Sequence, residues 1–274
     1  MRDLIRRLRR ARRFVSCIVL ALSWLIGSPA PAAEAIGIAG GQYLAALPPD
    51  WDGKSALPLV LFIHGYGESA AQAMAEPGLA AAATGQGALF IAPDGSDGNW
   101  SFTGAPHQGR DDIAFLHAVI EDAEKRWPID PRRVVASGFS IGASMVWELA
   151  CHSPRGFTAF LPISGTFWVP YPERCPGGPV TLRQVHGYND HTFPLAGRRI
   201  GLLWRQGNTA HGFEILRGLD RCQEAPDSTS QEGRLECSNW TGCGAGRLQL
   251  CLHSGDHEID PAWLADGLHW AFAR

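Results

Sequence analysis

The sequence predicts an α/β fold in which helices cover both faces of a mostly parallel central sheet. Three observations support this class. Continuous apolar runs such as "LPLVLFI" are typical of strands buried on both faces. Segments with helical periodicity alternate with these runs along the chain. The chain has 274 residues, of which 45% are hydrophobic, and this is enough for one substantial core.

The expected strands are short apolar or alternating runs that end at turn-forming residues. The first is an edge strand that leads into a proline-rich turn, and the others are buried strands of the parallel sheet. They lie within 40–53, 57–67, 88–95, 132–140, 157–165, 181–187 and 247–255.

The expected helices have apolar residues at helical spacing and recognisable ends. In the first helix, Pro77-Gly78 predicts a break. In the second, Asp111 and Asp112 suit the start and Pro128 ends the helical pattern. The helices are expected within 69–87, 110–130, 141–153, 195–208 and 261–274.

The N-terminal segment has the pattern of a secretory signal peptide. Met1–Arg13 holds seven arginines and one acid, and the apolar run Phe14–Ile26 and small residues follow. Cleavage after Ala32 suits this pattern. The alternative is an uncleaved membrane anchor, but the run of 13 residues is short for a bilayer span, which needs about 20. We therefore expect a signal peptide at 1–32.

The chain that remains, 33–274, is expected to be a single catalytic domain that is secreted or periplasmic, with no stable membrane insertion. It has 17 basic and 26 acidic residues, a formal charge of −9 against −3 for the whole chain. An acidic exported domain is a poor candidate for binding nucleic acid. Neutral substrates are expected instead.

Six cysteines remain after Cys17 leaves with the signal peptide. An even number in an exported chain predicts disulfides, and six cysteines allow fifteen pairings. A metal site is the alternative, but there is no C-x-x-C and the spacings form no zinc signature. Neither a metal nor a cofactor is expected. The six are Cys151, Cys175, Cys222, Cys237, Cys243 and Cys251. Three of them fall in the polar segment 208–247, which is expected to be a disulfide-pinned excursion from the domain.

The motif Gly138-Phe139-Ser140-Ile141-Gly142 lies between an expected strand and an expected helix. That context is the one a G-x-S-x-G motif requires to be a nucleophile elbow. The two glycines remove side chains that would clash in the tight turn. The hydroxyl of Ser140 is then exposed above the sheet edge as a candidate nucleophile.

A serine nucleophile needs a base, and the base needs an acid to orient it. In folds with this elbow, the acid and then the histidine follow later strands. Asp190 comes just after the strand at 181–187, and His257 follows the strand at 247–255. His186 and His253 lie in or at the ends of strands and are expected to be structural.

Two backbone amides are candidates for stabilising an oxyanion. The amide of Ile141 begins the helix after Ser140, and the amide of Tyr66 follows the early strand that ends at His64-Gly65. Trp100 and Trp168 follow strands at the same edge of the sheet and are candidates for stacking on a substrate. Burial among the loops is the equal alternative for both tryptophans.

The chain also resembles a known family. The segments "LVLFIHGYGESA", "WPIDPRRVVASGFS" and "HGYNDHTFP", with the loop around His257, are similar to secreted polyhydroxybutyrate depolymerases and feruloyl or acetylxylan esterases. The resemblance covers about residues 38–273. It implies an α/β-hydrolase fold and serine esterase chemistry with Ser140, Asp190 and His257 as the triad.

Two further expectations depend on this resemblance. Family members often carry Trp-Pro shortly after the histidine, where this chain has Glu258-Ile259-Asp260-Pro261. That departure concerns the substrate and leaves the triad intact. The family also often has a cysteine pair that resembles Cys222 and Cys243. If those two pair, Cys237 and Cys251 are expected to bridge the arms of the hairpin at 236–251, and Cys151 and Cys175 to close the loop after the nucleophile helix.

The function that these features predict is hydrolysis of a carboxylic ester through an acyl-enzyme. The partner is an ester substrate, either a small molecule or a polymer of the polyhydroxyalkanoate, feruloyl or acetyl type. A non-catalytic module that binds a polymer or glycan is the first alternative. A peptidase on the same scaffold is the second, but such peptidases usually carry a propeller or a large cap, for which this chain has no room.

Overall fold

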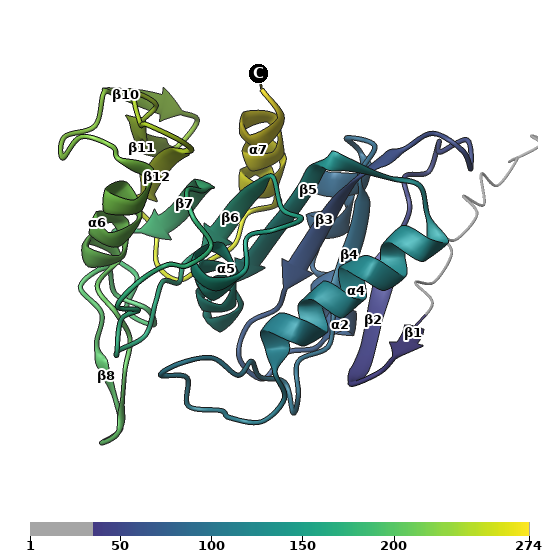
Figure 1. Ribbon diagram of the computed structural model, residues 1–274, viewed down its shortest axis with the longest axis horizontal. Helices are drawn as coiled ribbons and strands as arrows, with labels where there is room; N and C mark the ends of the chain where they lie inside the picture. The colour runs from purple at the N-terminus through teal and green to yellow at the C-terminus, as the bar shows by residue number, and fades with distance from the viewer. Residues whose placement is uncertain (1–34, 274) are drawn as a thin grey trace, which may run out of the picture. The chain divides into compact units, whose positions relative to one another are not determined.

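A computed structural model describes residues 35–273 of the chain. Ten strands form one sheet in the order β1-β2-β4-β3-β5-β6-β7-β12-β11-β10. The six central strands from β4 to β12 run parallel, and antiparallel pairs extend the sheet at both edges (Figure 1). The expected α/β class and mostly parallel sheet are confirmed. The strands of this sheet are β1 Ala35–Ile38, β2 Gly41–Ala46, β3 Leu57–Ile63, β4 Leu89–Pro93, β5 Ile129–Phe139, β6 Ala159–Ile163, β7 Thr181–Gly187, β10 Ser228–Glu232, β11 Leu235–Trp240 and β12 Arg247–His253.

Helices cover both faces of the sheet. Buried residues of α4, α5 and α6 pack in one apolar cluster, and those of α2, α3 and α7 pack in a second. The strands between the two clusters are buried on both sides, which explains their continuous apolar sequences. The helices are α2 Ala70–Ala75, α3 Leu79–Thr84, α4 Asp112–Arg126, α5 Ile141–His152, α6 Thr209–Asp220 and α7 Pro261–Phe272.

Local chemistry explains where these helices begin and end. The side chain of Asp111 accepts a hydrogen bond from the amide of Ala114 and caps α4. The side chain of Asn208 caps α6 in the same way, through the amide of His211. Pro77 separates α2 from α3, as the sequence predicts.

The helix expected within 195–208 is wrong. The segment instead contains a two-stranded hairpin of β8 Arg199–Ile200 and β9 Trp204–Arg205. Leu202 and Leu203 produced the apolar spacing that suggested a helix, yet their side chains are exposed at the turn of this hairpin. Their spacing in the sequence therefore does not indicate a helix face buried against the core.

The segment 208–247 contains regular structure that the sequence did not predict. It forms α6 and the strands β10 and β11, and β11 extends the main sheet by pairing with β12. The polar sequence "STSQE" of β10 has no apolar alternation because the strand lies at the edge of the sheet and is largely exposed. Because hydrogen bonds between backbones hold such a strand in place, its side chains need not alternate between apolar and polar, and the sequence does not predict it.

Three disulfides are present, with the pairing that the family resemblance implies. Cys151 pairs with Cys175, Cys222 with Cys243, and Cys237 with Cys251. The last pair joins directly opposed residues of β11 and β12. Glu232 lies close to this pair, but the bridged sulfurs offer no thiolate to a metal ion.

The signal peptide expected at 1–32 lies outside the described residues. Within residues 35–273, no helix combines the length and the apolar character needed to cross a bilayer.

Candidate active site

Ser140 occupies the sharp turn between β5 and α5, as the motif predicts. Its backbone has φ 57° and ψ −121°, a strained conformation for a residue with a side chain. A Cβ on Gly142 would collide with the carbonyl oxygens of Ile63 and His64, and one on Gly138 would lie 2.7 Å from the Ile63 oxygen. The two glycines therefore let the elbow pack directly against the end of β3.

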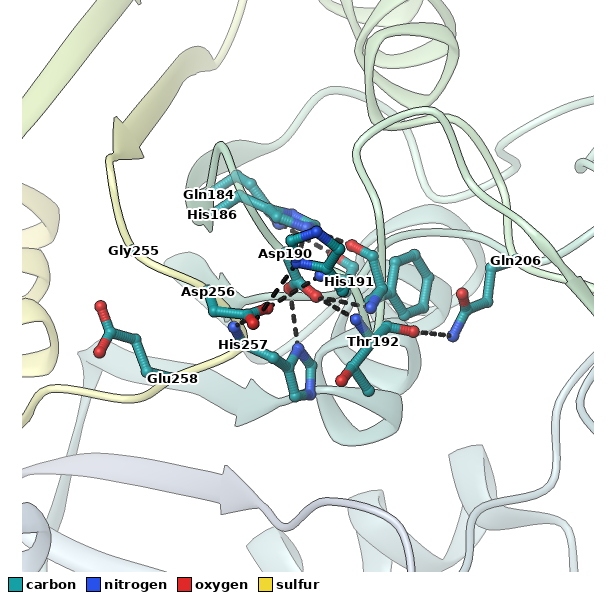
Figure 2. Close-up of polar contacts among 12 residues, drawn as sticks. Gln184, His186, Asp190, His191, Thr192, Gln206, Gly255, Asp256, His257 and Glu258 are labelled. Atoms are coloured by element: carbon teal, nitrogen blue, oxygen red, sulfur yellow. Dashed lines mark hydrogen bonds and ion pairs between the residues drawn. The ribbon is translucent and has the colours of Figure 1, made fainter.

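Asp190 lies in the loop that follows β7, where its charged form is well stabilised. One carboxylate oxygen accepts hydrogen bonds from the amides of Thr192 (2.9 Å) and Phe193 (2.6 Å). The other faces His257 Nδ1 at 2.8 Å and His186 Nε2 at 3.4 Å (Figure 2). Burial alone would raise the pKa of Asp190, but these hydrogen bonds outweigh it and hold the pKa well below its usual range.

His257 lies in the loop after β12 and is oriented by two acids. Asp190 faces its Nδ1, and Asp256 Oδ1 accepts from its backbone amide at 2.8 Å. The same Asp256 oxygen accepts from the amide of His191 at 2.9 Å, which ties the two loops together. Because Asp190 is ionised, Nδ1 carries the proton of the neutral ring and Nε2 is left unprotonated.

The imidazole of His257 also lies close to the elbow. Its ring packs on that of Phe139, with 4.7 Å between the ring centroids, and Phe139 directly precedes Ser140 in the chain. The structure thus brings the three expected side chains to one edge of the sheet, each at the end of a parallel strand.

The two proposed oxyanion donors follow the ends of neighbouring parallel strands, β3 and β5. Within the described residues, the amides of Tyr66 and Ile141 have no hydrogen-bond acceptor. The amides on either side of Tyr66 are held: Gly65 donates to Glu68 Oε2 at 2.8 Å, and Gly67 donates to the Gly98 oxygen at 2.8 Å. The Tyr66 amide therefore belongs to a fixed loop and is free for a ligand.

The suggestion that Trp100 and Trp168 stack on a substrate is wrong. Trp100 is fully buried, and its Nε1 donates to the His64 oxygen at 2.9 Å. Trp168 is 4% exposed, and its Nε1 donates to Ser144 Oγ at 3.2 Å. Both rings lie inside the loop layer and support the end of β3 and the first turn of α5, so a substrate cannot reach their faces.

His186 has a role that its sequence position does not reveal. Its Nε2 lies 2.7 Å from the Phe193 oxygen, and Gln184 Nε2 lies 3.0 Å from its Nδ1. Since a carbonyl only accepts, Nε2 must carry the proton that also points at Asp190. His186 therefore helps to hold Asp190, a contact that depends on the conformation of the loop after β7 and leaves no signal in the sequence.

Glu68 and Asp256 are the other residues that sequence reasoning missed. Both act on backbone amides beside the expected site, Glu68 at Gly65 and Asp256 at His191 and His257. The contact of Asp256 with His191 depends on how two loops meet in space, and the contact of Glu68 with Gly65 depends on the conformation of one loop. Their sequence positions carry no such signal.

The fold is that of an α/β-hydrolase, and comparison with known proteins shows that the chain is a carboxylic-ester hydrolase. Probable feruloyl esterase C of Aspergillus terreus is 32% identical over 240 residues, which cover 84% of this chain and 81% of that protein. Feruloyl esterase C of Emericella nidulans is 30% identical over 240 residues, with coverage of 84% and 81%. No protein-family model matches.

Solved structures show the same fold. The acetyl xylan esterase from Aspergillus awamori superposes with a TM-score of 0.65 over 88% of this chain and 98% of its own, at 14% identity. A fluorophosphonate-binding serine hydrolase of Staphylococcus aureus, FphF, gives a TM-score of 0.57 at 12% identity, with 89% and 98% coverage. The chain belongs to the feruloyl esterase family and has the α/β-hydrolase fold.

Proposed function

We propose that the protein is an exported serine esterase that cleaves its substrate through an acyl-enzyme. The observation that carries the proposal is the 2.8 Å contact of His257 with Asp190, with the ring packed beside the strained Ser140 turn. A serine hydroxyl is activated by an oriented imidazole beside it, and Ser140 is half-buried in its turn.

In the acylation step, Ser140 Oγ attacks the ester carbonyl carbon and His257 Nε2 takes the hydroxyl proton. The amides of Ile141 and Tyr66 bind the oxygen that becomes negative. The C–O bond to the alcohol then breaks, and His257 Nε2 returns its proton to the departing oxygen. Water repeats the sequence on the acyl-enzyme and releases the acid. Asp190 stabilises the imidazolium in both steps.

The names of the relatives favour a feruloyl ester as substrate. Acetyl esters and polyhydroxyalkanoates are the other members of the expected substrate class. Where the family often has Trp-Pro, this chain has Glu258-Ile259-Asp260-Pro261. Because of this difference, the acyl preference is tested by experiment.

The test is a hydrolysis panel with methyl ferulate, acetylated xylan, hydroxybutyrate oligomers and simple acyl esters. We expect turnover of at least one hydroxycinnamoyl or short acyl ester, and its loss in Ser140→Ala with an unchanged thermal melt. Activity that persists in Ser140→Ala would exclude the proposed mechanism. A folded protein that binds xylan yet cleaves none of the esters would favour a binding module.

Export through removal of residues 1–32 is part of the proposal. It is supported by the basic and apolar pattern of that segment and by the three disulfides, since disulfides persist in oxidising compartments. The excursion at 208–247 is proposed to belong to the same domain, because β11 and β12 pair within the main sheet. The mass of the chain recovered outside the cytoplasm would show whether it begins at Ala33.

A further inference from the structure

A cavity of about 420 Å³ lies beside His257, between α2, α3 and the loop that follows β12. Its floor is apolar and includes the buried side chains of Phe62 and Leu79. Three carboxylates, from Glu68, Glu76 and Glu258, contribute to its walls. No lysine or arginine is among its lining residues in the described chain. The cavity is thus lined by buried apolar side chains and by three acidic residues.

The charges of these carboxylates are only partly compensated. Glu258 Oε1 lies 3.2 Å from Arg234 Nη1 and 3.2 Å from the buried His253 Nδ1. Glu68 accepts from the uncharged amide of Gly65. Glu76 is exposed at the end of α2, and within the described residues its carboxylate makes no ion pair. A net negative potential therefore remains.

The position of the cavity relative to the triad indicates which half of an ester it holds. His257 and Phe139 line it, whereas Ser140 and the two oxyanion amides do not. The imidazole is the group that delivers a proton to the departing alcohol oxygen when the C–O bond breaks. A cavity that meets the site at the imidazole is therefore placed for the alcohol.

We propose that this cavity binds the alcohol portion of the ester and selects uncharged alcohols over those that carry a carboxylate. The proposal rests on the proposed serine esterase function. A carboxylate on the alcohol would be repelled by the carboxylates of the cavity, and because Glu76 is exposed, salt should screen this repulsion. A neutral alcohol meets no such repulsion and can hydrogen-bond to the same carboxylates.

The test uses two pairs of esters whose members differ by one carboxylate on the alcohol. One pair is caffeoylquinate and its methyl ester, and the other is 3-butyryloxybutyrate and its methyl ester. At an ionic strength of about 10 mM, we expect kcat/KM to be about tenfold higher for each methyl ester that is cleaved. The difference should shrink at about 0.5 M salt. The rate is measured as release of caffeate or butyrate, for which both members of a pair form the same acyl-enzyme, so any difference must arise in acylation.

Charge reversal at Glu76 tests the role of the carboxylates directly. In Glu76→Lys, we expect the ratio of kcat/KM within a pair to fall by about threefold or more. The matched control is Glu124→Lys, which makes the same charge change at an exposed position of α4, on the opposite face of the sheet. The control should leave the ratio as it is in the unmodified protein.

Several results would overturn the proposal. Equal kcat/KM values within the cleaved pairs at low salt would show that the carboxylates of the cavity do not discriminate between charged and uncharged alcohols. If Glu76→Lys and Glu124→Lys change the ratio of kcat/KM within a pair equally, the selectivity would come from the net charge of the protein and not from the cavity. If Glu76→Lys instead alters the preference between monomethyl succinate and methyl butyrate, the cavity holds the acyl group. In all these cases Ser140-dependent cleavage persists, so they are distinct from a failure of the proposed function, in which neither pair is cleaved.

Discussion

Asp190 shows how a single carboxylate is kept charged in a buried position. Two amides and two imidazoles surround its oxygens, and together they outweigh the burial that would raise its pKa. Removing its charge would leave His257 without a partner for the imidazolium and would permit the wrong tautomer.

We therefore expect Asp190→Asn to lower kcat about 10³- to 10⁴-fold on the ester that the panel identifies. KM should change much less, because Asp190 contacts His257 rather than the substrate. Steady-state kinetics on protein of verified fold measures this. The control is Asp260→Asn, which alters an acid three residues from His257 that has no contact with its ring. A loss below tenfold in Asp190→Asn would remove Asp190 from the triad.

At the residue scale, the sequence predicts the three side chains because each has a distinctive place at a strand end. It could not predict the roles of Trp100 and Trp168, since burial in a loop layer depends on the conformation of several loops. Glu68 and His186 were missed for the same reason. They act through a backbone amide and through another side chain, and neither contact has a sequence signature.

At the level of elements, the buried strands and the capped helices were predictable because burial on both faces and capping side chains leave strong patterns. The hairpin of β8 and β9 and the edge strand β10 were not. Their side chains are largely exposed, so hydrogen bonds between backbones determine their structure and the apolar pattern does not.

The end of α6 carries a buried acid with consequences for stability. Asp220 is fully buried, one of its oxygens accepts from the Val180 amide at 2.9 Å, and the other has no partner in the described residues. Burial raises its pKa to about 7, and the Val180 hydrogen bond opposes this. The carboxyl of the unfolded chain has a pKa of about 3.9. Since the folded state binds the proton more tightly, stability is lost as the pH rises from about 4 through 7.

Asp220→Asn should remove this pH dependence while keeping an acceptor for Val180. We expect the variant to gain stability relative to the unmodified protein as the pH rises, on the order of 2–4 kcal/mol at pH 8, about 1 kcal/mol at pH 5 and little at pH 3. Urea unfolding at several pH values measures the difference. Asp227→Asn is the opposite control, because hydrogen bonds from the amides of Gly242 and Thr241 lower the pKa of that exposed acid. If the difference in unfolding free energy between Asp220→Asn and the unmodified protein does not increase with pH, this explanation would be contradicted.

At the scale of the whole molecule, the parallel strands bring their carboxyl ends to one edge, and the loops after β3, β5, β7 and β12 meet there (Figure 1). The topology explains why the order of Ser140, Asp190 and His257 along the chain was informative. Each residue follows a different strand, and the sheet places those strands in a contiguous region.

The central claim is that Ser140 is an activated nucleophile, and covalent labelling with a fluorophosphonate tests it most directly. We expect one equivalent of label on the native protein, located at Ser140 by peptide mass spectrometry. Labelling should be absent in Ser140→Ala and strongly slowed in His257→Ala, while both variants keep the native thermal melt. A folded native protein that takes up no label, or that is labelled equally well in Ser140→Ala, would contradict the account.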